Sequence, residues 1–279
     1  MSRLTLFHVG FLFLILFFTT TAKAQKEAET FNVDSTLYEY YQRCQEYLLE
    51  PVVLSMSDTL FRMAGERHDE RMQAVAIATR LDYYYFQGTN EDSVIHYTNK
   101  VKEFAKATHQ PKYYYFAWAN RLITYYLKTS RTNIALYEVQ NMLKEAQEED
   151  DKTGLSRCYN IMSQIYTIKR FDSMAFEWRL KEIELTEKYK IENYNISQTY
   201  AQIANYYINQ KKQKEALAAV EKAIATANSS TQQISAKLEF VNYYSKFGDF
   251  QAAEKLLKEC QAAFEQDKRL ESIKKRLYN

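Results

Sequence analysis

The sequence predicts an all-α fold in which about six antiparallel helix pairs stack into a solenoid. Three observations lead to this fold class. The 279 residues include only five Gly and two Pro, which sheets and their turns require more often than helices joined by short loops. A pattern of apolar and small residues returns every ~36–40 residues, the period range of helical solenoids. Tyr occurs 24 times, and its amphipathic ring suits thin helical layers, where one end of a side chain reaches water.

Residues 1–24 have the three-part pattern of a secretory signal peptide. Arg3 gives a positive start, Leu4 to Phe18 form a mostly apolar run, and Ala22 and Ala24 are small residues two apart. The run is short for a membrane-spanning helix. We therefore expect cleavage near Ala24 and export to the periplasm or the cell exterior, with an uncleaved N-terminal anchor as the alternative. No second apolar stretch approaches transmembrane length, so no membrane segment is expected in the mature chain.

The charge balance argues against a nucleic-acid partner. The leader holds Arg3 and Lys23 and no acidic residue, so 35 of the 37 basic residues remain in the mature chain, against 35 acidic ones. Nucleic-acid binders usually concentrate a basic excess on one face, and the sequence contains no long basic run.

The repeat is clearest between Ile196 and Ala227. In its first helix the apolar and aromatic residues recur at spacings that put them on one helical face. A polar break follows, and then a second helix with its own inner stripe. The first stripe consists of Tyr200, Ile203, Ala204 and Tyr207, and the second of Ala216, Val220 and Ala223.

Neighbouring segments repeat this skeleton with decreasing fidelity. The predicted repeats span 34–71, 72–110, 112–150, 152–193, 194–230 and 231–268, between a linker at 25–33 and a capping or incomplete helix at 269–279. Their first helices are marked by Tyr38 and Tyr41 with Tyr47, Leu81 and Tyr84, Leu122 and Tyr126, Tyr159 and Tyr166, Tyr200 and Tyr207, and Phe240 and Tyr244. The expected breaks are Pro51, Gly88-Thr89-Asn90, Thr129-Ser130-Arg131, Arg170-Phe171-Asp172, Gln210–Gln213 and Lys246–Phe250.

These helix pairs resemble the tetratricopeptide repeat, whose first helix carries an aromatic, an apolar residue, a small residue and a Tyr at these spacings. No copy has Gly at the small-residue position, and none ends its second helix with Pro, so single matches are weak and the repetition carries the resemblance. It covers residues 34–268. It implies a right-handed superhelix that binds a protein or peptide, because this repeat is a general interaction scaffold.

No polar constellation in the sequence points to an enzyme, a cofactor or a metal site. His68, His96 and His109 lack a ligand spacing, and phosphate-binding Gly-rich loops and Gly-x-Ser-x-Gly motifs are absent. Cys158 and Cys260 fall at helix-packing positions and are expected to act as small apolar residues, although one pair of the three cysteines could still form a disulfide. We therefore expect no catalytic residue, no cofactor and no bound metal.

Two Tyr-rich strings suggest an aromatic ligand box at first sight. They are Tyr83–Phe86 and Tyr113–Phe116. Consecutive residues of a helix point about 100° apart, so each string spreads over several faces and cannot form one flat platform. Packing within and between repeats is the better interpretation.

The resemblance implies that the first helices line the inner surface of the superhelix, and this surface is the candidate binding groove. Polar residues that leave the packing stripe on that side are Asp82, Asn120, Thr124, Lys128, Arg157, Asn160, Gln164, Asn205, Asn209, Asn242 and Lys246. Asn recurs in four successive repeats, and its side chain offers both a donor and an acceptor to the backbone of an extended peptide. Chance recurrence at exposed polar positions is the alternative. The two-Lys carboxylate clamp of some family members is not reproduced.

The sequence therefore predicts a non-enzymatic binding module that acts outside the cytoplasm and recruits a protein or peptide through its concave face. Exported Tyr-rich repeats of this kind also resemble the sensor halves of some bacterial histidine kinases and transcription regulators. An extracytoplasmic sensor portion of such a regulator is the alternative function, and the genomic sequence downstream of Asn279 tests it.

Overall fold

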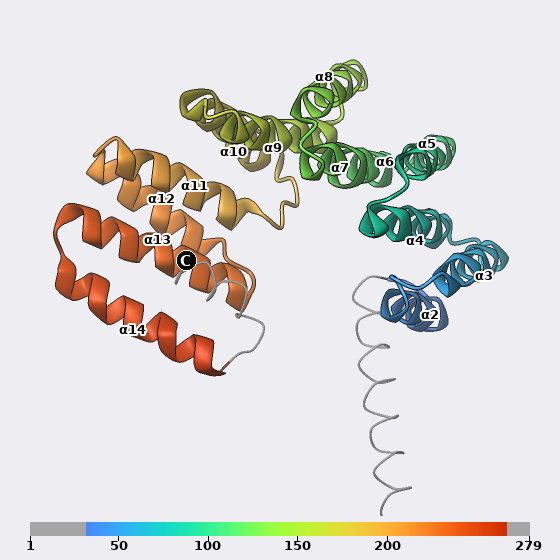
Figure 1. Ribbon diagram of the computed structural model, residues 1–279, viewed down its shortest axis with the longest axis horizontal. Coiled ribbons are helices and arrows are strands. Elements are labelled where there is room, and N and C mark those ends of the chain that lie inside the picture. The colour runs from blue at the N-terminus through green and yellow to red at the C-terminus, as the bar shows by residue number, and fades with distance from the viewer. Residues whose placement is uncertain (1–31, 267–279) are drawn as a thin grey trace, which may run out of the picture. The chain divides into compact units, whose positions relative to one another are not determined.

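The computed structural model of the protein describes residues 32–266. The predicted leader, most of the linker and the expected capping helix lie outside the described residues. Within them, the chain is helical almost throughout and forms no strand (Figure 1). This confirms the all-α fold class.

Contacts between residues divide the chain into two compact units, Met1–Met142 and Leu143–Asn279, and each is described by itself. The first unit contains α2 (Ser35–Glu46), α3 (Val52–Glu66), α4 (Glu70–Gln87), α5 (Glu91–Ala107), α6 (Pro111–Ala117), η1 (Trp118–Ile123), α7 (Thr124–Lys128) and most of α8 (Thr132–Glu148). The second contains the end of α8 with α9 (Lys152–Ile168), α10 (Asp172–Tyr189), α11 (Ile196–Asn209), α12 (Gln213–Ala225), α13 (Ser230–Phe247) and α14 (Phe250–Gln266).

Short turns with a regular chemistry separate these helices. Several helices begin at a polar side chain that accepts a hydrogen bond from the free backbone N–H groups of the first turn. These N-caps are Asp34, Asp69, Asn90, Asp151 and Ser229. Two helices end at glycines with a positive φ, 70° at Gly88 and 90° at Gly248, which is the left-handed conformation that terminates a helix without a Cβ clash.

The first helix pair differs from the sequence expectation in one respect. Tyr47 was expected on the same helix as Tyr38 and Tyr41, but α2 ends at Glu46, and Tyr47 is the residue that caps it. The chain then turns through Pro51, which stands at the N-cap of α3. Proline lacks a backbone N–H and therefore fits the start of a helix, where that donor has no partner within the helix.

The first helix of the third pair is also not the uniform α-helix that the periodicity predicts. It is divided into α6, the π-helical segment η1 and α7. The Thr124 hydroxyl donates to the carbonyl of Ala119, five residues earlier, at 2.9 Å. A π turn depends on which backbone carbonyl each N–H reaches, which the spacing of apolar residues does not specify, so the sequence pattern does not reveal it.

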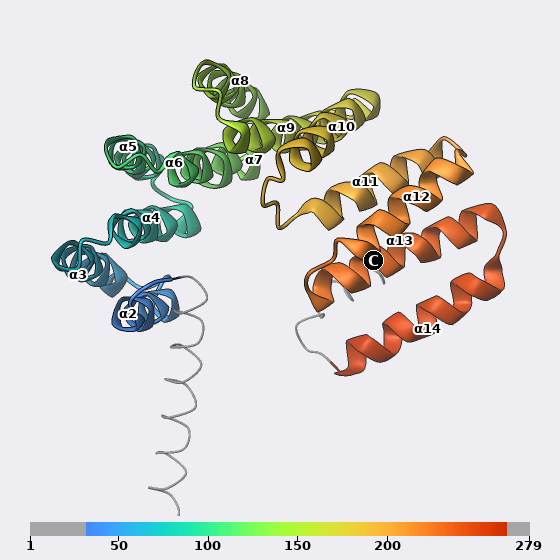
Figure 2. The same ribbon diagram turned by 180° about the vertical axis from the view of Figure 1, so that it is seen from behind.

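Small side chains dominate the core of the second unit. Ala204, Ala216, Val220 and Ala223 are fully buried among α11, α12 and α13, and both views of the ribbon show these three helices side by side (Figures 1 and 2). Alanine at the contact positions lets helix axes approach closely. Because these packed faces hold α11 and α13 in a fixed rotation, they also determine which faces of the two helices stay outside the core.

The three cysteines are free and buried. Burial raises the pKa of the Cys44 thiol to about 11, and it also raises the pKa values of Cys158 and Cys260. Cys158 and Cys260 therefore pack as small apolar residues, as the sequence predicts.

Candidate binding cleft

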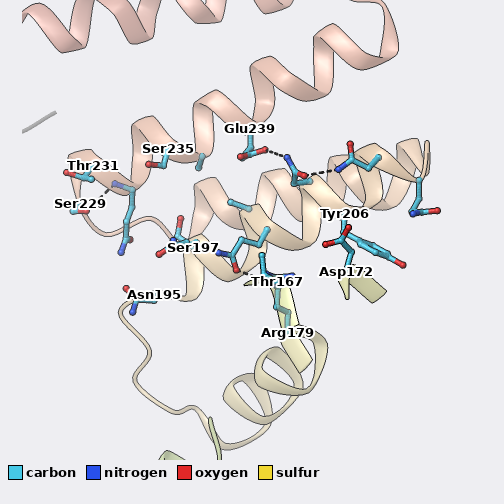
Figure 3. Close-up of a pocket in the computed structure, with 18 residues that line it drawn as sticks. Thr167, Asp172, Arg179, Asn195, Ser197, Tyr206, Ser229, Thr231, Ser235 and Glu239 are labelled. Carbon is cyan, nitrogen blue, oxygen red and sulfur yellow. Dashed lines mark hydrogen bonds between the residues drawn. The ribbon is translucent and has the colours of Figure 1, made fainter. Parts of the chain in front are cut away.

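The second unit contains a cleft of about 680 Å³ that follows α11 between α10 and α13 (Figure 3). A smaller hollow of about 380 Å³ on the α9 side shares Asn195, Gln198 and Gln202 with it. Carboxamide side chains dominate both walls. They are Asn160, Gln164, Asn195, Gln198, Gln202, Asn205, Asn209, Gln210 and Gln232.

Helical periodicity explains why one face of α11 is so polar. Gln198, Gln202, Asn205 and Asn209 are three or four residues apart and therefore share a face. Ala204 and Ile208 lie on the opposite side and are buried in the core. The α11 helix thus separates an apolar packing face from an amide-lined cleft face.

Arg179 reaches the cleft from α10, the second helix of its pair. Its side chain is largely buried, with 7% of the residue exposed. Its Nε donates to Oε1 of Gln202 at 2.8 Å, and one terminal nitrogen donates to the Thr167 hydroxyl at 2.7 Å. Burial lowers the pKa of the guanidinium, and the nearby carboxylates of Glu182 and Asp172 oppose that shift. Arg179 therefore joins α9, α10 and α11 through hydrogen bonds.

Glu182 lies one turn further along α10 and is only 1% exposed. Both of its oxygens accept from Nδ2 of Asn160 at 3.2 Å, and it also accepts from Asn193 at 2.9 Å and from Thr199 at 3.4 Å. Burial raises the pKa of this carboxyl group, while the hydrogen bonds and Arg179 partly offset the rise. A buried carboxylate is tolerated here because several donors surround it.

Glu239 on α13 repeats this arrangement on the other side of α11. It accepts a hydrogen bond from Nδ2 of Asn205 at 3.3 Å, and Asn209 in turn donates to Oδ1 of Asn205 at 3.0 Å. Burial raises the pKa of Glu239, and hydrogen bonds from Asn205 and Asn242 counteract this. Figure 3 shows Glu239 on α13 at the start of this chain of hydrogen bonds.

The predicted groove residues of the second unit divide into two groups. Asn160, Gln164, Asn205 and Asn209 line the two hollows. The others do not line them: Asn242 bonds to Glu239, Lys246 is exposed on α13, and Arg157 is half-buried with a pKa that burial lowers.

The predicted residues of the first unit are mostly engaged with their own surroundings. Asp82 was expected to face the groove, but it forms an ion pair with Arg121 in which its side chain is only 15% exposed. Thr124 donates to a carbonyl of its own helix, and Nζ of Lys128 lies 4.1 Å from the centre of the Tyr85 ring. Asn120 is half-buried within η1.

Sequence reasoning missed three charged residues in and behind the walls of the cleft and the hollow, Arg179, Glu182 and Glu239. It searched first helices only, whereas two of these residues are on α10. One signal was present: Arg179 and Glu182 follow Ala175 at spacings of four and seven, which places charges on the buried stripe of that helix. A charge on a packing stripe needs a partner, and it therefore indicates a polar network.

Residues 32–266 contain no group of three or more His, Cys, Asp or Glu side chains arranged to hold a metal ion. None of the helices in this range is long and apolar enough to cross a membrane.

Comparison with known proteins gives matches at the level of structure alone. The scan against protein-family models finds no match, and neither does the search of the curated proteins. Among solved structures, BtubC (BKLC) from P. vanneervenii matches with a TM-score of 0.60 and 14% identity, over 83% of this chain and 93% of that chain.

Two more solved structures are similar. The apo form of RapI matches with a TM-score of 0.58 and 14% identity, over 91% of this chain and 71% of that one. A variant of the kinesin light chain TPR-like repeats of Podosopora anserina matches with a TM-score of 0.51 and 14% identity, over 72% and 98% of the two chains. The chain therefore has the fold of the tetratricopeptide-like helical repeat proteins.

Proposed function

We propose that this protein is a non-enzymatic scaffold that binds a protein or peptide partner in the cleft along α11. The observation that carries the proposal is a hollow of about 680 Å³ lined by carboxamides on a tetratricopeptide-like fold. Carboxamides both donate and accept hydrogen bonds, so they suit a partner whose own donors and acceptors alternate.

The spacing of the amides supports an extended peptide as the bound form. Gln198, Gln202, Asn205 and Asn209 recur at about one helical turn, or about 5–6 Å along the axis. Alternate residues of an extended chain are about 6.6 Å apart, and their backbone groups point to the same side. Successive amides along α11 can therefore meet every second peptide group of an extended partner.

We also propose that the protein acts outside the cytoplasm, on the strength of the signal-peptide pattern in residues 1–24. Fractionation of the producing cell, with N-terminal sequencing of the purified protein, tests this. A mature N-terminus near Gln25 in an extracytoplasmic fraction supports it, and an intact leader on cytoplasmic protein contradicts it. The alternative function, the extracytoplasmic sensor portion of a regulator, stays a prediction.

The binding site is tested with peptides selected from a random display library on the purified protein. Hydrogen exchange then maps the bound surface, with protection expected on the helices that line the cleft and its neighbouring hollow, α9, α10, α11 and α13. Protection confined to α12 and α14 would contradict the choice of face.

A double variant makes the same test by mutation. Gln198→Ala with Asn209→Ala removes two exposed amides of the cleft and is expected to weaken peptide binding about tenfold or more. Gln140→Ala with Gln213→Ala is the matched control, because both are exposed amides that do not line the cleft. Equal binding by both double variants would refute the proposed site.

A further inference from the structure

Two successive repeats contain the same chain of hydrogen bonds, which we call an amide relay. In the α11 relay, Asn209 donates to Asn205 at 3.0 Å, and Asn205 donates to the carboxylate of Glu239 at 3.3 Å. In the α9 relay, Gln164 donates to Asn160 at 2.7 Å, and Asn160 donates to the carboxylate of Glu182 at 3.2 Å. Each relay begins at a carboxylate, buried in the case of Glu182 and half-buried in the case of Glu239, and ends at an exposed amide.

The carboxylate fixes the direction of each relay. An ionised carboxyl group can only accept hydrogen bonds, so the NH₂ group of Asn160 or Asn205 must face it, and the amide oxygen must face the other way. That oxygen then accepts from the NH₂ group of Gln164 or Asn209. The exposed end of each relay therefore directs its carbonyl oxygen away from the carboxylate and toward incoming groups.

The charges of the cleft also favour a partner whose side chains donate hydrogen bonds and carry positive charge. Its lining includes two carboxylates, those of Asp172 and Glu239, and one guanidinium, that of Arg179. The Arg179 side chain is 7% exposed and already donates to Gln202 and Thr167. An acidic side chain beside Glu239 and the relay ends would thus meet a carboxylate and outward-facing carbonyl oxygens, whereas an ammonium or guanidinium would meet acceptors there. Gln202, whose oxygen accepts from Arg179, keeps its NH₂ group as a donor for carbonyl groups of the peptide backbone.

We propose that the two amide relays present acceptors to the cleft and to the neighbouring hollow, and that they select an extended peptide that carries Lys or Arg and lacks acidic side chains. This specificity rests on the proposed function, because it describes the partner of the same cleft. The recognition elements are Gln164 and Asn209 at the relay ends and Glu239 beneath them.

Three synthetic peptides of about six or seven residues, the length that matches α11 in extended form, test the selectivity. They alternate Ala with Lys, Ser or Glu and carry the same fluorophore. Anisotropy titration at low salt is expected to give binding of the Lys peptide at least tenfold tighter than that of the Glu peptide. The Ser peptide is expected between them.

Two variants separate the relay from general electrostatics. Asn209→Lys replaces an exposed relay end by a donor and is expected to reduce the Lys-over-Glu preference to about threefold or less. Glu239→Gln removes the carboxylate that orients the α11 relay and is expected to do the same, with circular dichroism checking that it folds. Glu254→Gln on α14, whose side chain is 67% exposed and paired with Lys258, is the control and should keep the full preference.

The outcomes distinguish the two proposals. Binding of the Glu peptide as tight as that of the Lys peptide would overturn the acceptor relay while leaving peptide binding intact. An undiminished preference in Asn209→Lys would also overturn the relay. Failure of all three peptides, together with failure of the display selection, would overturn the proposed function itself.

Discussion

Replacing Glu182 by Ala is expected to lower the free energy of unfolding by about 3 kcal/mol. Glu182 is 1% exposed and accepts hydrogen bonds from Asn160, Asn193 and Thr199. Its removal leaves the NH₂ groups of Asn160 and Asn193 without this acceptor, at about 1–3 kcal/mol for each one that water cannot reach, whereas Thr199 can still donate to the carbonyl of Asn195. It also withdraws the negative charge beside the buried guanidinium of Arg179. Relief from burying a carboxylate offsets part of this loss.

Thermal unfolding followed by circular dichroism is the assay. For a repeat protein of this size a loss of about 3 kcal/mol corresponds to a fall in Tm of about 6–12 °C. Glu184→Ala, at an exposed position of the same helix, is the control and should change Tm by about 2 °C or less. If Glu182→Ala unfolded at the same temperature as Glu184→Ala, the carboxylate of Glu182 would not hold α9, α10 and α11 together.

Three further predictions concern pH, a helix end and the cysteines. Burial raises the pKa values of Glu182 and Glu239, so the stability that their protonated forms contribute is fully present below the ordinary Glu pKa and is lost as pH rises through the raised pKa values. In urea titrations, the free energy of unfolding of Glu239→Gln relative to that of the wild type should therefore increase with pH across this interval. A difference that stays flat or falls would contradict the raised pKa. Gly248→Ala should lower the free energy of unfolding by about 1 kcal/mol, because φ is 90° there while no atom obstructs a Cβ, and an unchanged urea midpoint would argue against the left-handed helix end. Iodoacetamide at neutral pH should leave Cys44, Cys158 and Cys260 unmodified in the folded protein and alkylate all three in denaturant, because burial raises the pKa of each thiol. Mass spectrometry measures the labelling, and rapid labelling of any of the three in the native state would contradict its burial.

Local rules in the sequence were sufficient for the fold class and many helix ends. Scarce Gly and Pro, a recurring apolar stripe and a small set of turn residues are read directly from neighbouring positions. The same stripe placed Cys158 and Cys260 in the packing, where the structure finds them buried. The sequence also indicated Asn160 and Asn205 as polar residues on first helices, and both line a hollow.

Tertiary packing alone decided what those asparagines do. Asn205 meets Glu239 across 34 positions of the chain, Asn160 meets Glu182 across 22, and Asp82 is paired with Arg121 across 39. Periodicity tells which face of a helix a residue occupies, but not which residue of another helix lies opposite. That pairing depends on the distance and rotation between packed helices. By itself, then, the sequence determined an all-helical repeat with amides on its first helices, and the structure decided that carboxylates from neighbouring helices orient those amides.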